Sequence, residues 1–177
     1  MAHFEIVKGY ENKGIQLPTR ATEQSAGYDL SAAIGGVIPS LYKAWKLSET
    51  NHQLTSTIYY EQVNDLLKMF PGLKPALIPT GLKCKMAPDE YLKIVARSSL
   101  PLKGGLIVAN AEGIIDADYY GNENNDGHIF IQVLNFTPQD IEISAGTKLA
   151  QAILCKYYTM EDDNAANKRV GGFGSTT

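Results

Sequence analysis

Cysteine, tryptophan and histidine are scarce in this chain of 177 residues, which has two, one and three of them respectively. Cys84 and Cys155 lie far apart in apolar runs and form neither a disulfide framework nor a zinc-site spacing. We expect both to be buried free thiols. His3, His52 and His128 also lack the spacing of metal ligands. These absences exclude a disulfide-stapled secreted domain and a structural zinc protein.

Long apolar runs and an excess of basic charge are also missing. No stretch approaches the roughly 18 apolar residues that a membrane-spanning helix requires, and residues 1–10 lack the pattern of a signal peptide. The 16 Lys and Arg residues against 19 Asp and Glu residues give a net charge of −3, which does not suit a protein that neutralises the phosphates of long nucleic acids. We therefore expect a soluble cytoplasmic protein whose partners include neither a membrane nor long nucleic acid.

The pattern of apolar residues indicates one all-β domain. With 44% apolar residues, a chain of this length is able to bury one core and is too short for two ordinary domains. Apolar residues recur mostly with a period of two, and the segments between them carry the Gly, Pro, Asp and Ser of turns. The clearest predicted strands are residues 4–7, 91–96, 128–136, 141–143 and 148–154. Short strands at this spacing favour a β-barrel or jelly roll over a parallel α/β sheet.

Three segments depart from the strand pattern. Between Ser56 and Phe70 the apolar residues fall at helical offsets, which predicts one short amphipathic helix inside an insertion at residues 39–73. Residues 121–127 (GNENNDG) form a polar loop. Residues 161–177 change from an acidic to a glycine-rich composition, which is typical of an arm that becomes ordered on contact.

A few polar residues stand at positions where chemistry is possible. Asp29 opens a strand and Asp116 lies between a strand and a turn, although a lone aspartate at such a place is more often a turn former or a solvated charge. Arg97 with the two serines that follow it offers a guanidinium and hydroxyls to phosphate oxygens, and the alternative is a surface ion pair. The glycines of residues 171–176 let backbone N–H groups approach an anion, unless this end is a flexible terminus. Neither a Gly-x-Ser-x-Gly elbow nor the nucleotide-binding patterns GxxxxGKS/T and GxGxxG occurs.

Taken in order, these segments resemble the five motifs of the trimeric dUTPase family. The matching motifs are Ala26-Gly-Tyr-Asp29-Leu, Arg97-Ser98-Ser99-Leu100, Gly113-Ile-Ile-Asp116-Ala-Asp-Tyr119-Tyr-Gly121, Gly146-Thr-Lys-Leu-Ala-Gln151 and Arg169-Val-Gly-Gly-Phe173-Gly-Ser175-Thr176. The resemblance implies a single domain over residues 1–177 with a distorted jelly-roll fold, which assembles as a homotrimer with shared active sites. The insertion and the polar loop resemble elaborations found in some bacterial and phage relatives.

In the reaction that the resemblance implies, dUTP is hydrolysed to dUMP and pyrophosphate. Asp116 would orient and deprotonate the water that attacks the α-phosphorus, and Asp29 would hold, through water molecules, a Mg²⁺ ion that bridges the three phosphates. In-line phosphoryl transfer requires mainly a positioned nucleophile and neutralised oxygens, and Mg²⁺ supplies much of that neutralisation.

The resemblance also assigns the substrate contacts. Tyr119 would lie against the deoxyribose and leave no room for a 2′-hydroxyl, and Asn110 would form, with the backbone of residues 111–115, a hairpin that binds uracil. Gly113 and Ile115 are the other substrate-binding positions of the hairpin. The positions on the phosphate side are Arg97, Ser98, Ser99 and Gln151. Those of the arm are Arg169, Phe173, Gly174, Ser175 and Thr176. The arm would act as a lid contributed by another subunit, with Phe173 stacked on uracil.

Two alternative functions remain open. A dCTP deaminase shares the fold but needs a glutamate on the strand after Asp116, where this chain has Gln132 and Asn135. A regulatory role through a protein partner, as in phage-type relatives, is favoured by aromatic residues of the insertion such as Trp45 and Tyr59, although such residues are more often local core. Ammonia release from dCTP would indicate the first alternative. Loss of partner capture without loss of hydrolysis, on deletion of residues 39–73, would indicate the second.

Overall fold

Strands form most of the regular structure in the part of the chain that the structure describes. The computed structural model describes residues 1–43, 46, 74–167, 169 and 172. The helix predicted within residues 56–70 and most of the insertion lie outside this part. No helix among the described residues is long and apolar enough to cross a membrane. In chain order the elements are β1 (His3–Ile6), β2 (Tyr28–Ser31), β3 (Gly36–Ile38), β4 (Ala76–Pro79), β5 (Leu82–Lys85), β6 (Glu90–Ala96), α3 (Ser99–Gly104), β7 (Leu106–Val108), β8 (Glu112–Asp116), the 3₁₀ helix η2 (Ala117–Tyr119), β9 (Phe130–Asn135), β10 (Ile141–Ile143) and β11 (Lys148–Lys156).

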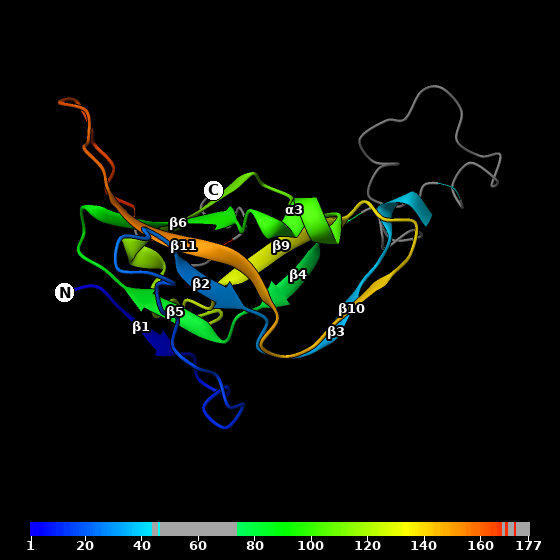
Figure 1. Ribbon diagram of the computed structural model, residues 1–177. Helices are drawn as coiled ribbons and strands as arrows, with labels where there is room; N and C mark the ends of the chain where they lie inside the picture. The colour runs from blue at the N-terminus through cyan, green and yellow to red at the C-terminus, as the bar shows by residue number, and fades with distance from the viewer. Residues whose placement is uncertain (44–45, 47–73, 168, 170–171, 173–177) are drawn as a thin grey trace.

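The strands form a four-stranded sheet, a three-stranded sheet and two short ribbons (Figure 1). The larger sheets have the orders β2-β11-β6-β8 and β4-β9-β7, while β1 pairs with β5 and β3 with β10. Each of these pairs is antiparallel. The β3-β10 ribbon runs away from the body of the molecule, and residues 41–43, which are helical, lie near its far end. The all-β fold that the sequence predicts is confirmed.

Alternating residues of the two larger sheets build one hydrophobic core. Ile131 and Val133 of β9 are fully buried, as are Leu92 and Ile94 of β6, while their neighbours along each strand are only half-buried. Burial of each such side chain contributes about 1.5–3 kcal/mol to folding. The five strands predicted from alternation all occur, with bounds that differ by one or two residues at most.

Two local predictions differ from the structure. Residues 101–105, whose proline and glycines predict a turn, lie mostly in the short helix α3, which ends at Gly104 and is followed by Gly105 with a φ of 61°. Pro101 is compatible with this helix because it stands in the first turn, where a backbone N–H has no intrahelical partner. Cys84 is buried as expected, but Cys155 is only half-buried because it lies beyond Ala152, the last residue of β11 that pairs with β2.

The first residues of the predicted insertion belong to the folded domain. Ser40 is 1% exposed, and its backbone N–H donates to the Asp140 carboxylate at 2.9 Å. Its hydroxyl donates to the carbonyl of Thr137. The Lys43 ammonium forms an ion pair with Asp140 at 2.8 Å. These contacts fix the end of the β3-β10 ribbon and anchor the first residues of the predicted insertion, up to Lys43, to the domain.

Candidate active site

The predicted site residues that the structure describes gather in two separate places. One group, called here the Asp29 cluster, consists of the predicted residues Asp29, Arg97 and Gln151 together with Lys148, which was not predicted. The other lines a cavity, called here the Asp116 pocket, and includes Asn110, Gly113, Ile115, Asp116, Tyr119 and Arg169. Phe173, Gly174, Ser175 and Thr176 lie outside the described residues.

Three donors surround the carboxylate of Asp29. Arg97 Nε lies 3.0 Å from Oδ1 and Lys148 Nζ lies 2.9 Å from Oδ2, while the side-chain amide of Gln151 donates to Oδ1 at 3.5 Å. The Asp29 side chain is 6% exposed. Burial by itself would raise the pKa of Asp29, but the hydrogen bond from Lys148 and the charge of Arg97 outweigh it, so this pKa lies below its ordinary value of 3.8.

An irregularity in β11 allows Lys148 and Gln151 to reach the same carboxylate. Residues three apart on a regular strand point to opposite faces of the sheet. The register between β11 and β2 shifts between Lys148 and Ala150, where a β-bulge interrupts the pairing. The bulge turns one side chain to the other face, and both Lys148 and Gln151 then contact Asp29. The alternation pattern of the sequence gave no indication of this shift, and the role of Lys148 was therefore missed.

Gly27 makes room for the Gln151 side chain. A Cβ atom at Gly27 would lie 2.9 Å from Cβ and 3.0 Å from Cδ of Gln151. Contacts under about 3 Å force a neighbour to move. The glycine of the first motif therefore acts by packing against the fourth motif, two segments that pair directly as β2 and β11.

Ser98 and Ser99 lie at the start of α3, just after Arg97. Ser98 has helical angles, with φ −54° and ψ −32°, and its side chain makes no capping hydrogen bond to the helix. The dUTPase motif usually has glycine where Ser99 stands, but a helical conformation here is open to any L-residue. The serine is therefore accommodated without backbone strain.

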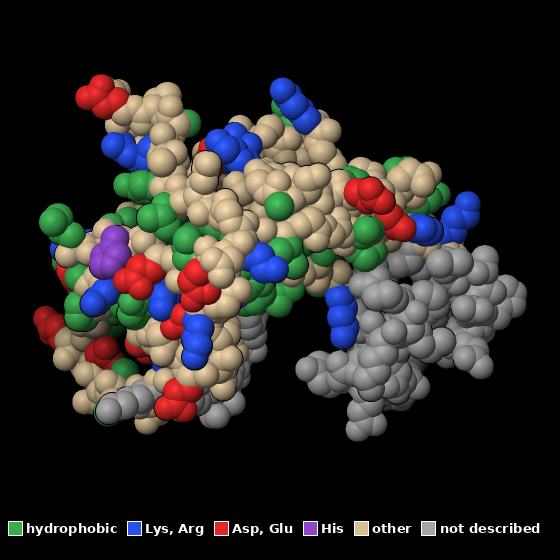
Figure 2. All heavy atoms as spheres, turned by 90° about the horizontal axis from the view of Figure 1, so that it is seen from below, with side chains coloured by type: hydrophobic (Ala, Val, Ile, Leu, Met, Phe, Trp, Pro, Cys, Tyr) green, Lys and Arg blue, Asp and Glu red, His purple; other side chains and the backbone are tan. Residues whose placement is uncertain are grey.

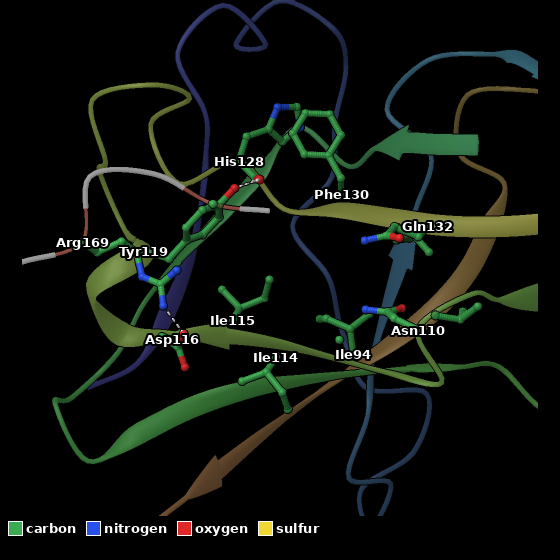
Figure 3. Close-up of a pocket in the computed structure, with 14 residues that line it drawn as sticks. Ile94, Asn110, Ile114, Ile115, Asp116, Tyr119, His128, Phe130, Gln132 and Arg169 are labelled. Carbon is green, nitrogen blue, oxygen red and sulfur yellow. Dashed lines mark hydrogen bonds and ion pairs between the residues drawn. The ribbon is translucent and has the colours of Figure 1, made fainter. Parts of the chain in front are cut away.

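The Asp116 pocket is a cavity of about 200 Å³ between β8 and β9 (Figure 3). Asp116 is the last residue of β8 and directly precedes η2, and its side chain is 48% exposed, so that water reaches the carboxylate. Ile115 and Tyr119 come from the same segment and line the cavity. The sharp turn from β8 into η2 therefore presents a carboxylate and an aromatic ring to one space.

The turn before β8 presents an amide to the pocket. Asn110 lies in a tight turn that places Ala111 at a φ of 56°. A Cβ atom at Gly113 would lie 3.2 Å from the side-chain nitrogen of Asn110, and glycine at that position lets the amide approach the strand. The expected hairpin is not a paired one, because β7 pairs with β9 whereas β8 pairs with β6. The turn thus joins the two larger sheets at the mouth of the cavity.

β9 and the two residues before it line the pocket with side chains that were not predicted as site residues. His128, Phe130 and Gln132 line the pocket, and they occupy every second position of a segment whose other residues are core. That alternation is the signal by which they could have been found. Asn135 is fully buried, and its amide donates to the carbonyl of Ile38 at 2.9 Å. With Gln132 in the pocket and Asn135 in the core, this strand brings no carboxylate to the site, and this disfavours the deaminase alternative.

The arm contacts the Asp116 pocket of its own chain. Arg169 pairs with the Asp116 carboxylate, its Nε donates to Asp118 at 2.7 Å, and its guanidinium carbon lies 6.0 Å from the centre of the Tyr119 ring. A Cβ atom at Gly172 would lie 2.7 Å from the Tyr119 ring, so only glycine fits this position without a shift. Arg169 thus lies beside Asp116 of its own chain, while its contact with the phosphates and the contribution of the arm to another subunit stay predictions.

The two groups are far apart within one chain. Asp29 pairs with Gln151, Gln151 with Val95 and Val95 with Glu112, so three strand spacings separate Asp29 from β8. Asp116 lies four residues further along β8. With about 4.8 Å between strands and about 3.3 Å per residue, the carboxylates of Asp29 and Asp116 are roughly 20 Å apart.

The carboxylates do not form a ready-made metal site. Among the described residues, no three His, Cys, Asp or Glu side chains come together in a way that could hold an ion. Asp29 is a single carboxylate that faces two cationic side chains. Mg²⁺ is commonly held by one or two carboxylates together with substrate phosphates. The residues therefore fit an ion that arrives with a triphosphate better than an ion bound by the free protein.

Known proteins that are similar to this chain share one family name. A family model described as dUTPase matches residues 62–177. The chain is 37% identical to a deoxyuridine 5′-triphosphate nucleotidohydrolase of Lactococcus lactis, over 98% of this chain and 95% of that protein. It is 32% identical to the protein of the same name from Rickettsia felis, over 96% and 94%. The crystal structure of a dUTPase from Streptococcus mutans superposes with a TM-score of 0.68 at 31% identity, covering 90% of this chain and 98% of the other.

Proposed function

Since this chain belongs to the dUTPase family, we propose that it hydrolyses dUTP to dUMP and pyrophosphate by a Mg²⁺-assisted attack of water on the α-phosphorus. The observation that carries the proposal is the Asp116 pocket, in which one water-accessible carboxylate, one aromatic ring and one amide from a tight turn meet. Its substrate belongs to the cellular nucleotide pool, and we therefore expect the enzyme to act in the cytoplasm.

Asp116 is the proposed general base. Its carboxylate lies at the edge of the cavity and is half exposed, so a water molecule is able to occupy the space between it and a bound phosphate. A positioned base of this kind contributes about 10²–10⁴-fold to a rate. The bond between the α-phosphorus and the bridging oxygen to the β-phosphorus breaks, and pyrophosphate leaves. The Arg169 guanidinium, which pairs with Asp116, must turn towards the phosphates before the base is free to act.

The rest of the pocket is the proposed binding site for the nucleoside. The Asn110 amide has donor and acceptor atoms for the edge of uracil, and the backbone of Gly113 and Ile115 lines the same space. The buried Tyr119 ring is proposed to pack against the deoxyribose, where a 2′-hydroxyl would collide with it. Burial of a hydroxyl without a partner is also unfavourable, and both effects disfavour UTP.

The Asp29 cluster is the proposed phosphate side of the site. Arg97, Lys148 and Gln151 supply two positive charges and an amide, and Ser98 supplies a hydroxyl. When bound, Mg²⁺ neutralises charge on the phosphate oxygens. Asp29 would hold its water ligands, while Arg97 keeps the carboxylate ionised and oriented.

A shared site follows from the distance between Asp29 and Asp116. The ion and the attacking water act on one triphosphate, whose phosphorus atoms are only a few bonds apart, whereas these carboxylates are roughly 20 Å apart in one chain. We therefore propose that the Asp29 cluster of one subunit faces the Asp116 pocket of another, in a closed trimer of identical subunits. Cyclic symmetry repeats such a contact and gives three equivalent sites.

Pyrophosphate release from dUTP, dCTP, dTTP and UTP, each with Mg²⁺ and with EDTA, tests the proposal. We expect release from dUTP with Mg²⁺ and loss of it with EDTA. Asp116→Asn removes the base and is expected to lower kcat by about 10³-fold. Asp118→Asn is the matched control, because Asp118 also contacts Arg169 but is more exposed, and this variant is expected to keep most of the activity.

Three results would contradict the proposal or part of it. No release from dUTP by the folded wild-type protein would reject hydrolysis. Ammonia release from dCTP would instead indicate the deaminase reaction. Equal loss of activity in Asp116→Asn and Asp118→Asn would reject the assignment of the base and leave the substrate assignment standing.

A further inference from the structure

We propose that the polar loop, residues 121–127, positions Tyr119 and thereby sets the discrimination between deoxyribose and ribose. The inference rests on the proposed function, in which Tyr119 packs against the sugar. It assigns a role to a segment that contributes no side chain to the lining of the Asp116 pocket.

The first contact of the polar loop is with the backbone of Tyr119. Both the backbone N–H and the side-chain amide of Asn122 donate to the Tyr119 carbonyl, at 3.3 Å and 3.0 Å. Asn122 is 8% exposed. These two bonds satisfy a buried carbonyl at the end of η2, and they fix the point from which the Tyr119 side chain extends.

The second contact is with the hydroxyl at the far end of the ring. The Asn125 amide donates to the Tyr119 hydroxyl at 2.7 Å, and this hydroxyl donates to the His128 carbonyl at 3.1 Å. A tyrosine hydroxyl has one hydrogen to donate, so the His128 carbonyl takes it and Asn125 supplies the accepted bond. The ring is therefore held at its backbone and at its tip.

The two asparagines also hold each other. The oxygen of the Asn122 side chain accepts the N–H groups of Asn124 and Asn125, at 3.1 Å and 3.2 Å. The oxygen of the Asn125 side chain accepts the Asn122 amide at 2.7 Å and the Gly127 N–H at 3.1 Å. The amide group of Asn125 therefore faces Tyr119 in a fixed orientation, because its other end is already bound.

The polar loop is tied to a different part of the molecule. Both carboxylate oxygens of Asp126 lie 2.9 Å from Lys83 Nζ on β5, and one of them accepts the N–H of Lys8 at 3.1 Å. Gly127 has a φ of 79°, and a Cβ atom there would lie 2.7 Å from the Tyr119 carbonyl. The loop thus packs closely on Tyr119 and is braced from outside the pocket.

Tyr119 is consequently fixed relative to the space that the sugar would occupy. A ring that is free to tilt gives way to one additional oxygen atom, whereas a ring held at both ends does not. Asn125 is therefore a positioning residue for sugar specificity. It acts through Tyr119 and is not expected to touch the substrate.

The test compares kcat/KM for dUTP and UTP in the full-length protein with Mg²⁺. Asn125→Ala removes the bond to the Tyr119 hydroxyl, and we expect the preference for dUTP to fall about fivefold, the factor that corresponds to one hydrogen bond. The change should come mainly from faster hydrolysis of UTP. Glu123→Ala is the matched control, because Glu123 is an exposed residue of the same loop, and it should leave the preference unchanged.

Tyr119→Phe provides a second test that does not alter the loop. This variant keeps the ring but loses both bonds of the hydroxyl, so the preference should also fall. If Asn125 acts through that hydroxyl, Asn125→Ala should have little further effect in the Tyr119→Phe background. Full additivity of the two effects would overturn the inference.

Other outcomes separate this inference from the proposed function. A parallel loss of dUTP and UTP hydrolysis in Asn125→Ala, with a lower melting temperature, would assign the loop a structural role only and overturn the inference. A wild-type enzyme that prefers dUTP, with an unchanged preference in Asn125→Ala, would overturn the inference alone. A wild-type protein without dUTP hydrolysis would reject the proposed function first.

Discussion

Arg97 and Asp29 form an ion pair across the intervening strand β11, with Arg97 Nε 3.0 Å from Asp29 Oδ1. The carboxylate is almost completely buried, whereas the guanidinium is partly open to solvent. Arg97 therefore stabilises the folded protein even before any substrate binds, since a buried carboxylate without a cationic partner is unfavourable.

Removal of this partner should lower stability. We expect Arg97→Ala to decrease the free energy of unfolding by about 1 kcal/mol, because Lys148 and Gln151 remain as partners of Asp29. Urea denaturation at one fixed protein concentration measures the change. Lys156→Ala is the control: its pair with Asp89 is exposed on both sides, and no measurable change is expected. Equal stability of Arg97→Ala and the wild type would show that Lys148 alone is sufficient to balance the negative charge of the buried Asp29 carboxylate.

Stability should fall as the pH decreases below neutrality because of His128. Burial lowers the pKa of His128 from 6.5 to about 4, and its Nε2 accepts the N–H of Gly81 at 2.8 Å, a bond that requires the neutral ring. Below pH 6.5 the unfolded chain binds a proton that the folded chain does not. The contribution of the neutral ring is therefore complete above the unfolded pKa and is lost as the pH falls towards the folded one.

His128→Gln tests this dependence. The glutamine oxygen is able to accept the same N–H group but does not titrate. We expect the wild type to lose about 2 kcal/mol per subunit more than the variant between about pH 7 and about pH 5. Urea denaturation at the two pH values measures the difference, and parallel losses in both proteins would assign the acid sensitivity to other groups.

Gly27→Ala should impair the phosphate side of the site. The added methyl group would lie 2.9 Å from Gln151 Cβ, so Gln151 must shift away from Asp29. Small displacements of positioning groups are costly, and we expect kcat/KM for dUTP to fall by about tenfold or more. Gly36→Ala is the control, because a Cβ atom at Gly36 meets nothing within 4 Å. Full activity of Gly27→Ala would mean that Gln151 does not contact the substrate.

Mixed trimers should regain activity if sites are shared between subunits. Asp116→Asn and Asp29→Asn are each expected to be inactive. One of the three sites of every mixed trimer combines an intact Asp116 with an intact Asp29, so purified mixed trimers should have about a third of the wild-type activity. Coexpression with two different tags, followed by tandem purification and pyrophosphate release, measures it. No recovery in trimers that contain both variants would place the complete site within one chain.

Part of this molecule could be read directly from the sequence. The alternation of HIFIQVLNF predicts β9 because every second residue is apolar and enters the core, and the same argument predicts β6 and β11. The fold class follows from such local patterns. The resemblance of the five motifs to the dUTPase family predicts Asp29, Arg97, Asp116 and Tyr119 as site residues, from residue types and order and without any distance.

Other features depended on the tertiary structure. Lys148 reaches Asp29 because a bulge changes the direction of its side chain, and a bulge leaves no clear trace in an alternation pattern. Asn125 meets the Tyr119 hydroxyl because η2 and the polar loop fold back on each other. His128 and Gln132 enter the pocket because β9 faces β8 across it.

The sequence by itself determined which residues are apolar, where strands alternate and which chemical groups are available, because these depend on neighbours along the chain. The tertiary structure alone decided which groups meet. It brought Asp29, Arg97 and Gln151 together through the register of three strands, and the same register separated Asp29 from Asp116 by roughly 20 Å. Such distances depend on pairing between remote segments, and no local pattern encodes them.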